Sequence, residues 1–268
     1  MLIMESTNKS FRFHNKEKMN TSCIPILGVQ INATNMDLAL KQIETWLSER
    51  SSNYICVAPA HSIMECVNDP TLLPIFNDAG MVTPDGMAVV WLLKFKGHKH
   101  VGRVYGPDLL HAACAHGLSK GYRHYFYGGA PGVAEKLVEK LSEHFPGLQV
   151  AGMLAPPFRS LSPEEDQEII RQINAARADI IWVGLGSPKQ EIWMHSHLGK
   201  VNAPLMVGVG AAFDFLSGKK TQAPLWIQRH GLEWLFRFAS EPVRLWPRYR
   251  QYPKFILLVM AEGLGLLK

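Results

Sequence analysis

Two side chains suited to proton transfer each follow a short apolar run. Asp85 lies in TPDG, between a short apolar strand and an apolar helix predicted for Met87–Leu93. An aspartate before glycine commonly only forms a turn. After a strand in an α/β array, however, it could face a ligand crevice and act as general base on a hydroxyl. His61, in APAHS, occupies an equivalent strand-to-helix junction and is the second candidate base.

Glycine-bearing turns follow three predicted strands. They read GGAPG from Gly128, GLGSPKQE from Gly184 and GVG from Gly208. In a parallel sheet such turns gather at the carboxyl ends of the strands, where ligands bind, and N–H groups at a helix start can hold a diphosphate. A single glycine there more often serves tight packing, and none of these turns is a GxGxxG or Walker sequence. Three together favour a phosphate-bearing ligand.

The second turn is the richest in polar side chains. Gln190 and Glu191 would lie at a helix start, where they could hydrogen-bond sugar hydroxyls or a uracil; the alternative is ordinary capping with a solvated charge pair. Arg103, in GRVYGPD, could neutralise a phosphate, or it could be an ordinary surface arginine. The predicted ligand-binding residues, besides Arg103, are Gly128, Gly129, Gly184, Gly186, Ser187, Lys189, Gln190, Glu191, Gly210 and Asp214.

No Asp-x-Asp occurs in the chain, so the usual carboxylate pair that holds a divalent metal on a donor diphosphate is missing. If the chain transfers a group from a diphosphate donor, we expect it to do so without a metal or another cofactor. Cationic side chains and helix dipoles would have to stabilise a leaving diphosphate instead.

Short β-branched or aromatic runs alternate with stretches of helical period, which predicts an α/β fold with a mostly parallel sheet flanked by helices. The predicted strands are Ile24–Gln30, Tyr54–Val57, Tyr122–Tyr127, Leu148–Ala151, Ile180–Val183 and Leu205–Val209. The predicted helices are Met36–Ser48, Asp108–Leu118, Val133–Phe145, Pro163–Ala176 and Lys189–His197.

The composition fits one compact intracellular enzyme. The chain has 268 residues, 47% of them hydrophobic, and a net charge of +5, which favours an anionic partner. The basic residues form no extended patch of the kind that binds nucleic acid. Four scattered cysteines fit neither a disulfide framework nor a zinc site. Residues 1–20 read as a disordered tail, 21–222 as an α/β core and 223–268 as a basic, aromatic appendage.

The appendage is rich in tryptophan, arginine and leucine, and Pro242 and Pro247 argue against one unbroken helix. Lys254–Lys268 is apolar but too short to span a bilayer. Tryptophans beside basic side chains favour docking on an anionic membrane surface; a helical cap with core tryptophans is the alternative. The tryptophans are Trp226, Trp234 and Trp246, and the arginines, at spacings of seven and four, are Arg237, Arg244 and Arg248.

The chain resembles the WecG/TagA/CpsF glycosyltransferases, also called glycosyltransferase family 26, from about Ile24 to Tyr249. The resemblance is carried, in order, by TPDGMAVVW, GRVYGPDLL, FYGGAPGVAEK, DIIWVGLGSPKQE, GVGAAFDFLSGKKTQAP and GLEWLFRFASEPVRLWPRY. It implies a Rossmann-like core with an appendage that docks on the membrane and completes the site.

The resemblance also implies an inverting, metal-independent transferase. Such an enzyme moves a sugar from a UDP-sugar to a polyprenyl-diphosphate-linked saccharide, peripherally on the cytoplasmic face of the membrane, in cell-surface polysaccharide synthesis. The sugars of the family include N-acetylmannosamine, uronic acids and hexoses. The family's general base falls on Asp85, its diphosphate-contacting arginine on Arg103 and its SPKQE glutamine on Gln190. Arg237, Arg244 and Arg248 match its phosphate-binding appendage arginines, with Arg250 as a further candidate, and a homo-oligomer fits the resemblance.

One departure stands out. Many members carry a Thr-x-Asn or Val/Ala-Asn turn after the second strand, whereas this chain has Pro59 at the asparagine position. The side-chain contact that this turn usually makes is either lost or supplied by His61 or Ser62. A catalytically silent, membrane-associated binding subunit of a polysaccharide assembly complex is therefore the alternative function. A nicotinamide-dependent oxidoreductase is disfavoured, because no glycine fingerprint with a downstream ribose-binding acid occurs.

Overall fold

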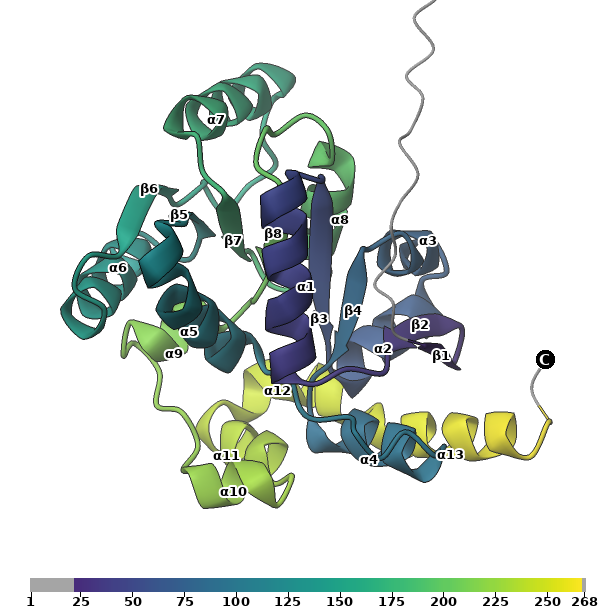
Figure 1. Ribbon diagram of the computed structural model, residues 1–268. Helices are drawn as coiled ribbons and strands as arrows, with labels where there is room; N and C mark the ends of the chain where they lie inside the picture. The colour runs from purple at the N-terminus through teal and green to yellow at the C-terminus, as the bar shows by residue number, and fades with distance from the viewer. Residues whose placement is uncertain (1–21, 267–268) are drawn as a thin grey trace, which may run out of the picture.

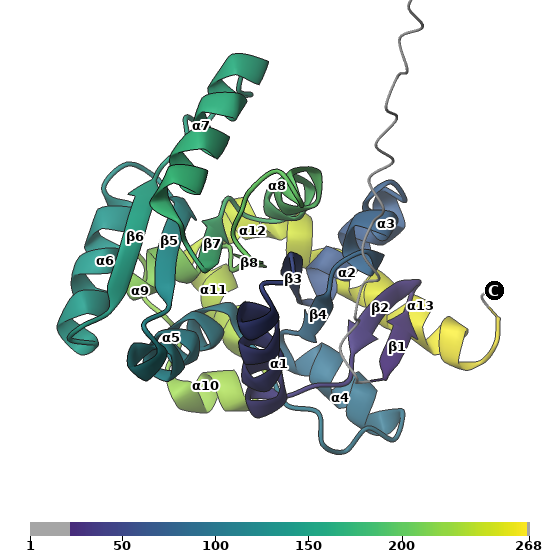
Figure 2. The ribbon, with the colours of Figure 1, turned by 45° about the horizontal axis from the view of Figure 1, so that its top comes forward.

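A single parallel sheet with helices on both faces forms the body of the protein, as a computed structural model describes it for residues 22–266 (Figures 1 and 2). The predicted tail, residues 1–20, lies outside the described residues. The strands are β1 Cys23–Ile26, β2 Val29–Asn32, β3 Asn53–Ala58, β4 Met81–Pro84, β5 Arg123–Gly128, β6 Gln149–Leu154, β7 Ile180–Gly184 and β8 Leu205–Gly208.

Thirteen α-helices and one 3₁₀ turn, η1 (Leu118–Lys120), occupy the described residues. The helices are α1 Met36–Glu49, α2 Ala60–Asn68, α3 Leu72–Asn77, α4 Met87–Phe95, α5 Gly106–Gly117, α6 Val133–His144, α7 Pro163–Ala176, α8 Lys189–His197, α9 Ala212–Leu216, α10 Leu225–Arg229, α11 Glu233–Ser240, α12 Pro242–Tyr249 and α13 Tyr252–Gly263.

The large sheet has the strand order β4-β3-β8-β7-β5-β6, and every pairing in it is parallel. All six carboxyl ends therefore face the same way. The predicted α/β fold with a parallel sheet is confirmed, and the turns after β3, β4, β5, β7 and β8 are brought to one edge.

The first predicted strand, Ile24–Gln30, is wrong as a member of that sheet. Leu27 and Gly28 both have positive φ (50° and 86°), and they form a tight turn that splits the run into an antiparallel hairpin of β1 and β2. Two successive positive φ values match the twist of a two-residue hairpin turn. The hairpin joins the edge of the large sheet through the Asn32 side chain, whose Oδ1 accepts the Val82 N–H at 2.7 Å.

Each face of the sheet packs against its own group of helices. On one face, α1, α5 and α6 contribute apolar residues such as Trp46, Leu109 and Leu137. On the other face, α2 and α8 contribute residues such as Ile63 and Met194. Burial on both faces explains why the strands read as continuous apolar runs and not as alternating ones.

The C-terminal helices α10–α13 lie along the carboxyl edge of the sheet (Figure 1). The predicted absence of one unbroken helix is confirmed, because α11, α12 and α13 are separate helices. Pro242 begins α12 as predicted, but Pro247 lies inside α12, and the second boundary comes before Tyr252. The start of α13 is held to α2, where Asn68 Nδ2 donates to Gln251 Oε1 at 2.6 Å. Its end is held to the hairpin, where the Leu27 N–H donates to Glu262 Oε1 at 2.8 Å.

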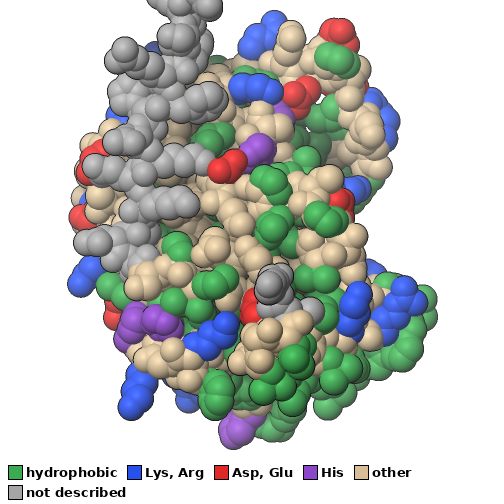
Figure 3. Space-filling model, turned by 90° about the vertical axis from the view of Figure 1, so that its right-hand side faces the viewer, with side chains coloured by type: hydrophobic (Ala, Val, Ile, Leu, Met, Phe, Trp, Pro, Cys, Tyr) green, Lys and Arg blue, Asp and Glu red, His purple; other side chains and the backbone are tan. Residues whose placement is uncertain are grey.

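Exposed apolar side chains gather low on the face shown in Figure 3, with basic side chains beside them. On α13 they are Ile256, Leu257 and Met260, and Leu264 follows that helix. Across residues 22–266, none of the helices combines the length and the apolar character needed to cross a bilayer.

Candidate active site

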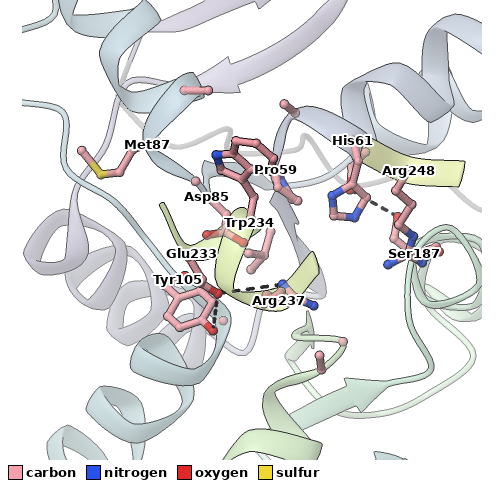
Figure 4. Close-up of a pocket in the computed structure, with 18 of the residues that line it drawn as sticks. Pro59, His61, Asp85, Met87, Tyr105, Ser187, Glu233, Trp234, Arg237 and Arg248 are labelled. Carbon is pink, nitrogen blue, oxygen red and sulfur yellow. Dashed lines mark hydrogen bonds and ion pairs between the residues drawn. The ribbon is translucent and has the colours of Figure 1, made fainter. Parts of the chain in front are cut away.

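A cavity of about 530 Å³ opens at the carboxyl edge of the sheet. Its floor comes from the ends of β3, β4 and β8 and the turn after β7, and α10–α13 close it from the other side. In Figure 4, Asp85, Tyr105, Glu233 and Arg237 gather in one part of the cavity, while His61, Ser187 and Arg248 gather in another. This is where an α/β sheet of this kind binds ligands.

Asp85 lies directly after β4, where the chain leaves the sheet. Its backbone N–H donates to the Ala58 carbonyl of β3 at 3.4 Å, and Gly86 takes a positive φ of 77° to start α4. The side chain lines the cavity and is mostly buried. Burial raises the pKa of Asp85, and the charge of Glu233 adds to that rise while Arg103 opposes it. A raised pKa suits a carboxylate that must accept a proton.

Arg103 is held by three acceptors. Its Nε donates to Asp85 Oδ1 at 3.2 Å, one terminal nitrogen donates to Gln228 Oε1 at 3.3 Å, and the other donates to Glu233 Oε2. Its guanidinium carbon also lies 3.9 Å from the centre of the Tyr105 ring. Although burial acts to lower it, the pKa of Arg103 is raised by Asp85 and Glu233. Arg103 is therefore a cation at the cavity wall and not a surface residue.

Sequence reasoning missed Glu233, which is central to this cluster. It begins α11, is 8% exposed, and accepts a hydrogen bond from Tyr105 Oη at 2.9 Å as well as from Arg103. Gln228 was missed too. Gly231, with φ of 72°, lets the α10–α11 turn approach α4, where a Cβ would lie 2.7 Å from the Trp91 ring. The one sequence signal available for Glu233 was that it is an acidic residue in a segment otherwise poor in acids.

His61 and Ser62 lie at the start of α2, beside the second turn. Ser62 Oγ is 3.4 Å from Ser187 Oγ, and both residues line the cavity with His61. Burial lowers the pKa of His61 to about 3, and the charges of Arg248 and Arg237 lower it further. His61 is therefore neutral near pH 7 and a poor proton acceptor. Pro59 also lines the cavity and caps α2 without a side-chain hydrogen bond.

Gln190 and Glu191 are both buried at the start of α8, at 3% and 0% exposure. Gln190 lines the cavity, and its Nε2 donates to Glu191 Oε1 at 2.8 Å. Burial raises the pKa of Glu191 to about 7 against the lowering effect of the hydrogen bond from Gln190. The alternative of a solvated charge pair at this turn is therefore wrong.

Two of the three predicted arginines of the C-terminal segment reach the cavity. Arg237 on α11 and Arg248 on α12 line it. Burial lowers the pKa of Arg248, and the charges of Arg244 and Arg237 add to the effect. Arg248 donates to the Ser187 carbonyl at 3.4 Å, and within residues 22–266 no carboxylate forms an ion pair with it. Arg244 is exposed instead, with its Nε donating to Glu241 at 3.0 Å.

Several residues of the predicted ligand-binding set stand apart from the cavity. Gly128 packs against β7, where a Cβ would lie 2.6 Å from the Gly184 carbonyl carbon, and Gly184 and Gly129 pack against Phe213. These glycines serve the close packing that was the alternative for each turn. Outside the cavity lining, Lys189 is exposed and Asp214 pairs with Lys220 at 3.3 Å. Gly186, Ser187 and Gly210 do line the cavity.

Over the part of the chain that the structure describes, no three histidine, cysteine or acidic side chains are grouped so that they could hold a metal ion. The ionic groups that line the cavity are the three arginines, Arg103, Arg237 and Arg248, and the two carboxylates, Asp85 and Glu233.

The cavity therefore combines a general-base candidate with arginines suited to a diphosphate, over the carboxyl edge of a parallel sheet. This combination fits a transferase of phosphate-linked groups. The sequence profile described as "Glycosyl transferase WecG/TagA/CpsF family" matches residues 24–268. The chain belongs to this family and is a glycosyltransferase, which confirms the resemblance seen in its motifs.

Three relatives carry the same name, N-acetylglucosaminyldiphosphoundecaprenol N-acetyl-beta-D-mannosaminyltransferase. The relative from Bacillus spizizenii is 29% identical over 218 residues, which cover 81% of this chain and 82% of that protein. The relative from Bacillus subtilis is 28% identical over 196 residues, or 73% and 74% of the two chains. The relative from Staphylococcus aureus strain MW2 is 26% identical over 245 residues, or 90% and 93%.

Proposed function

We propose that this chain transfers an N-acetylmannosaminyl unit, or a related uronic acid or hexose, from a UDP-sugar to a polyprenyl-diphosphate-linked saccharide in cell-surface polysaccharide synthesis. The relatives' names support both the sugar and the lipid-linked acceptor. The observation that carries the proposal is the cavity itself, where a buried carboxylate and three arginines face one space.

In the proposed reaction Asp85 takes the proton of the acceptor hydroxyl, and the hydroxyl oxygen then attacks the anomeric carbon of the donor. The bond from that carbon to the diphosphate breaks on the opposite face, so an α-linked donor gives a β-linked product. The burial that raises the pKa of Asp85 supports it over His61, whose pKa is lowered to about 3. The word "beta" in the relatives' names agrees with inversion.

The leaving diphosphate is held by arginines in this proposal, without a metal ion. Arg248 is the best placed, because it lies near Arg237 and Arg244, forms no ion pair among the described residues and would be stabilised by an anion. Arg237 and Arg103 add positive charge to the same cavity. Fixed cations of this kind stabilise the charge that develops on a leaving group.

The acceptor reaches the cavity from an anionic membrane surface in this proposal. Trp91 of α4 and Ile256 of α13 line the cavity and are 51% and 57% exposed, so apolar surface continues from the cavity to the outside. Exposed Trp226 and Trp246 add amphipathic side chains on the C-terminal helices, and the exposed basic residues Arg229 and Lys254 lie in the same segment. Such a surface favours peripheral docking on the inner face of the membrane.

A thermal-shift series with nucleotide sugars tests the donor class. UDP-sugars should raise the melting temperature in the presence of EDTA, because a ligand that binds only the folded state stabilises it. GDP- and ADP-sugars at the same concentration are the matched controls. An absence of stabilisation by every UDP-sugar would contradict the proposal, and stabilisation without turnover would favour the silent binding subunit.

A further inference from the structure

The buried pair at the start of α8 leaves two side-chain oxygens, Gln190 Oε1 and Glu191 Oε2, without a hydrogen-bond partner within the described protein. Gln190 uses its Nε2 on Glu191, but its Oε1 is buried and has no hydrogen-bond partner within the described protein. Because Gln190 lines the cavity, a molecule bound there is the natural source of the missing donor. Buried acceptors are rarely left unpaired in native proteins.

Glu191 determines which end of the Gln190 amide points into the cavity. An ionised carboxylate only accepts hydrogen bonds, so it must face the NH₂ group of the amide. The carbonyl oxygen is then turned away from Glu191 and left for the ligand. The two ends of the amide have similar shapes. Without the Glu191 acceptor, either end could therefore face the cavity.

Gly208, the last residue of β8, gives the amide its space. A Cβ there would lie 2.9 Å from Gln190 Nε2, too close for an ordinary contact. At Gly210 a Cβ would lie at an ordinary contact distance, 3.5 Å from Gln190 Oε1. The end of β8 is therefore packed closely against the Gln190 side chain, whereas the preceding Lys189 is exposed.

We propose that Glu191 is a positioning residue that presents the Gln190 carbonyl oxygen to an O–H or N–H group of the nucleotide-sugar donor. This inference rests on the proposed function, and it differs from the sequence expectation that Glu191 binds the ligand itself. Glu191 does not line the cavity; it acts through Gln190. The group that Gln190 binds is either the uracil N–H or a hydroxyl or amide N–H of the sugar.

The test variant is Glu191→Gln, which keeps the shape of the side chain but can donate as well as accept. At pH 8, where the native carboxyl is ionised, we expect the donor KM and Kd to rise about fivefold, the value of one ordinary hydrogen bond. The acceptor KM and kcat should stay within about twofold, because Glu191 does not itself line the cavity. Lys189→Gln, at the neighbouring exposed position, should leave all of these constants unchanged.

A double-mutant cycle separates positioning from a general structural role. Gln190→Leu alone should raise the donor KM by about fivefold or more. Adding Glu191→Gln to it should cause no further rise, because Glu191 would have nothing left to orient. Multiplicative effects, or an unchanged donor KM in Glu191→Gln, would overturn the inference. Glu191→Met, which removes the acceptor altogether, should raise the donor KM at least as much and provides a second variant if the first is poorly folded.

Titration with UDP and with a UDP-sugar identifies the group on the donor. If Gln190 binds the uracil, Glu191→Gln should weaken both ligands equally; if it binds the sugar, only the UDP-sugar should be weakened. Native protein that binds neither ligand would contradict the proposed function. If native protein binds UDP and the UDP-sugar, and Glu191→Gln binds each with the same affinity as native protein, only the role of Glu191 is contradicted.

Discussion

Glu233 links the C-terminal helices to the predicted general base, and the variant Glu233→Gln tests that link. The native carboxylate accepts from Arg103 and from Tyr105, and Arg237 lies 3.9 Å away. Glutamine keeps an acceptor for Tyr105 but loses the charge opposite Arg103. Two effects should follow, one on stability and one on the pH dependence of turnover.

The stability effect follows from burial. Hydrogen bonds to charged groups contribute about 1.5–3 kcal/mol. The Glu233 side chain is only 10% exposed, so solvent screens it weakly. Because Arg103 keeps its contact with Asp85, we expect a loss near the lower end, about 2 kcal/mol. For a chain of this size that corresponds to a fall of about 4–8 °C in melting temperature.

The pH effect follows from the charge that Glu233 places near Asp85. That charge raises the pKa of Asp85, so its removal lowers the pKa. Asp85 then stays ionised to lower pH, and the acid limb of the kcat/KM profile should move downward. Glu241→Gln is the matched control, because that carboxylate pairs with Arg244 and Lys220 outside the cavity.

Rate profiles between pH 4.5 and 8.5, with calorimetry on the same samples, measure both effects. An acid limb that stays fixed or moves upward in Glu233→Gln would refute the electrostatic account. So would an equal displacement in Glu241→Gln.

Three further outcomes are expected. Asp85→Asn should lower kcat at least about 100-fold while UDP affinity persists, since general-base catalysis contributes about that much. Single-turnover kinetics and UDP titration measure the two effects. Near-normal turnover would remove Asp85 from the role of general base. Glu191 has its pKa raised to about 7, so it favours the folded state below its ordinary pKa of 4.5 and loses that contribution as pH rises through 7. The free energy of unfolding of Glu191→Gln should therefore rise by up to about 3 kcal/mol relative to that of native protein between pH 4.5 and 8. Urea unfolding measures it. A difference between the two proteins that does not change with pH would contradict this. Trp91→Ala and Ile256→Glu should raise KM for long-chain polyprenyl acceptors but leave UDP affinity unchanged, whereas Phe158→Glu, at another exposed apolar position outside the cavity, should change neither.

The type of sheet was predictable from the sequence because both of its faces are covered. Continuous apolar runs such as Ile180–Val183, each followed by a polar or glycine-bearing turn, indicated buried parallel strands. The same reasoning failed at Ile24–Gln30, where Gly28 marked a hairpin turn inside an apolar run. Local pattern gives no account of which strands pair.

The candidate site was readable only in part. Asp85, Arg103 and Gln190 lie in motifs that the sequence shows, and the fold brings all three to one cavity. Gly128, Gly129 and Gly184 have the same local sequence pattern as Gly210. They pack against a neighbouring strand or against Phe213, because their neighbours in space decide their use. Glu233 could not be placed without knowing that α11 folds back over Arg103, a contact 130 residues apart in the chain.

The most direct test of the central claim is the product formed from a UDP-sugar and a polyprenyl-diphosphate-linked N-acetylglucosamine acceptor in the presence of EDTA. Proton NMR should show one UDP released for each sugar transferred and a β-configured linkage from an α-linked donor. Bound but unconsumed donor and acceptor, a requirement for a divalent metal, or an α-configured product would contradict it.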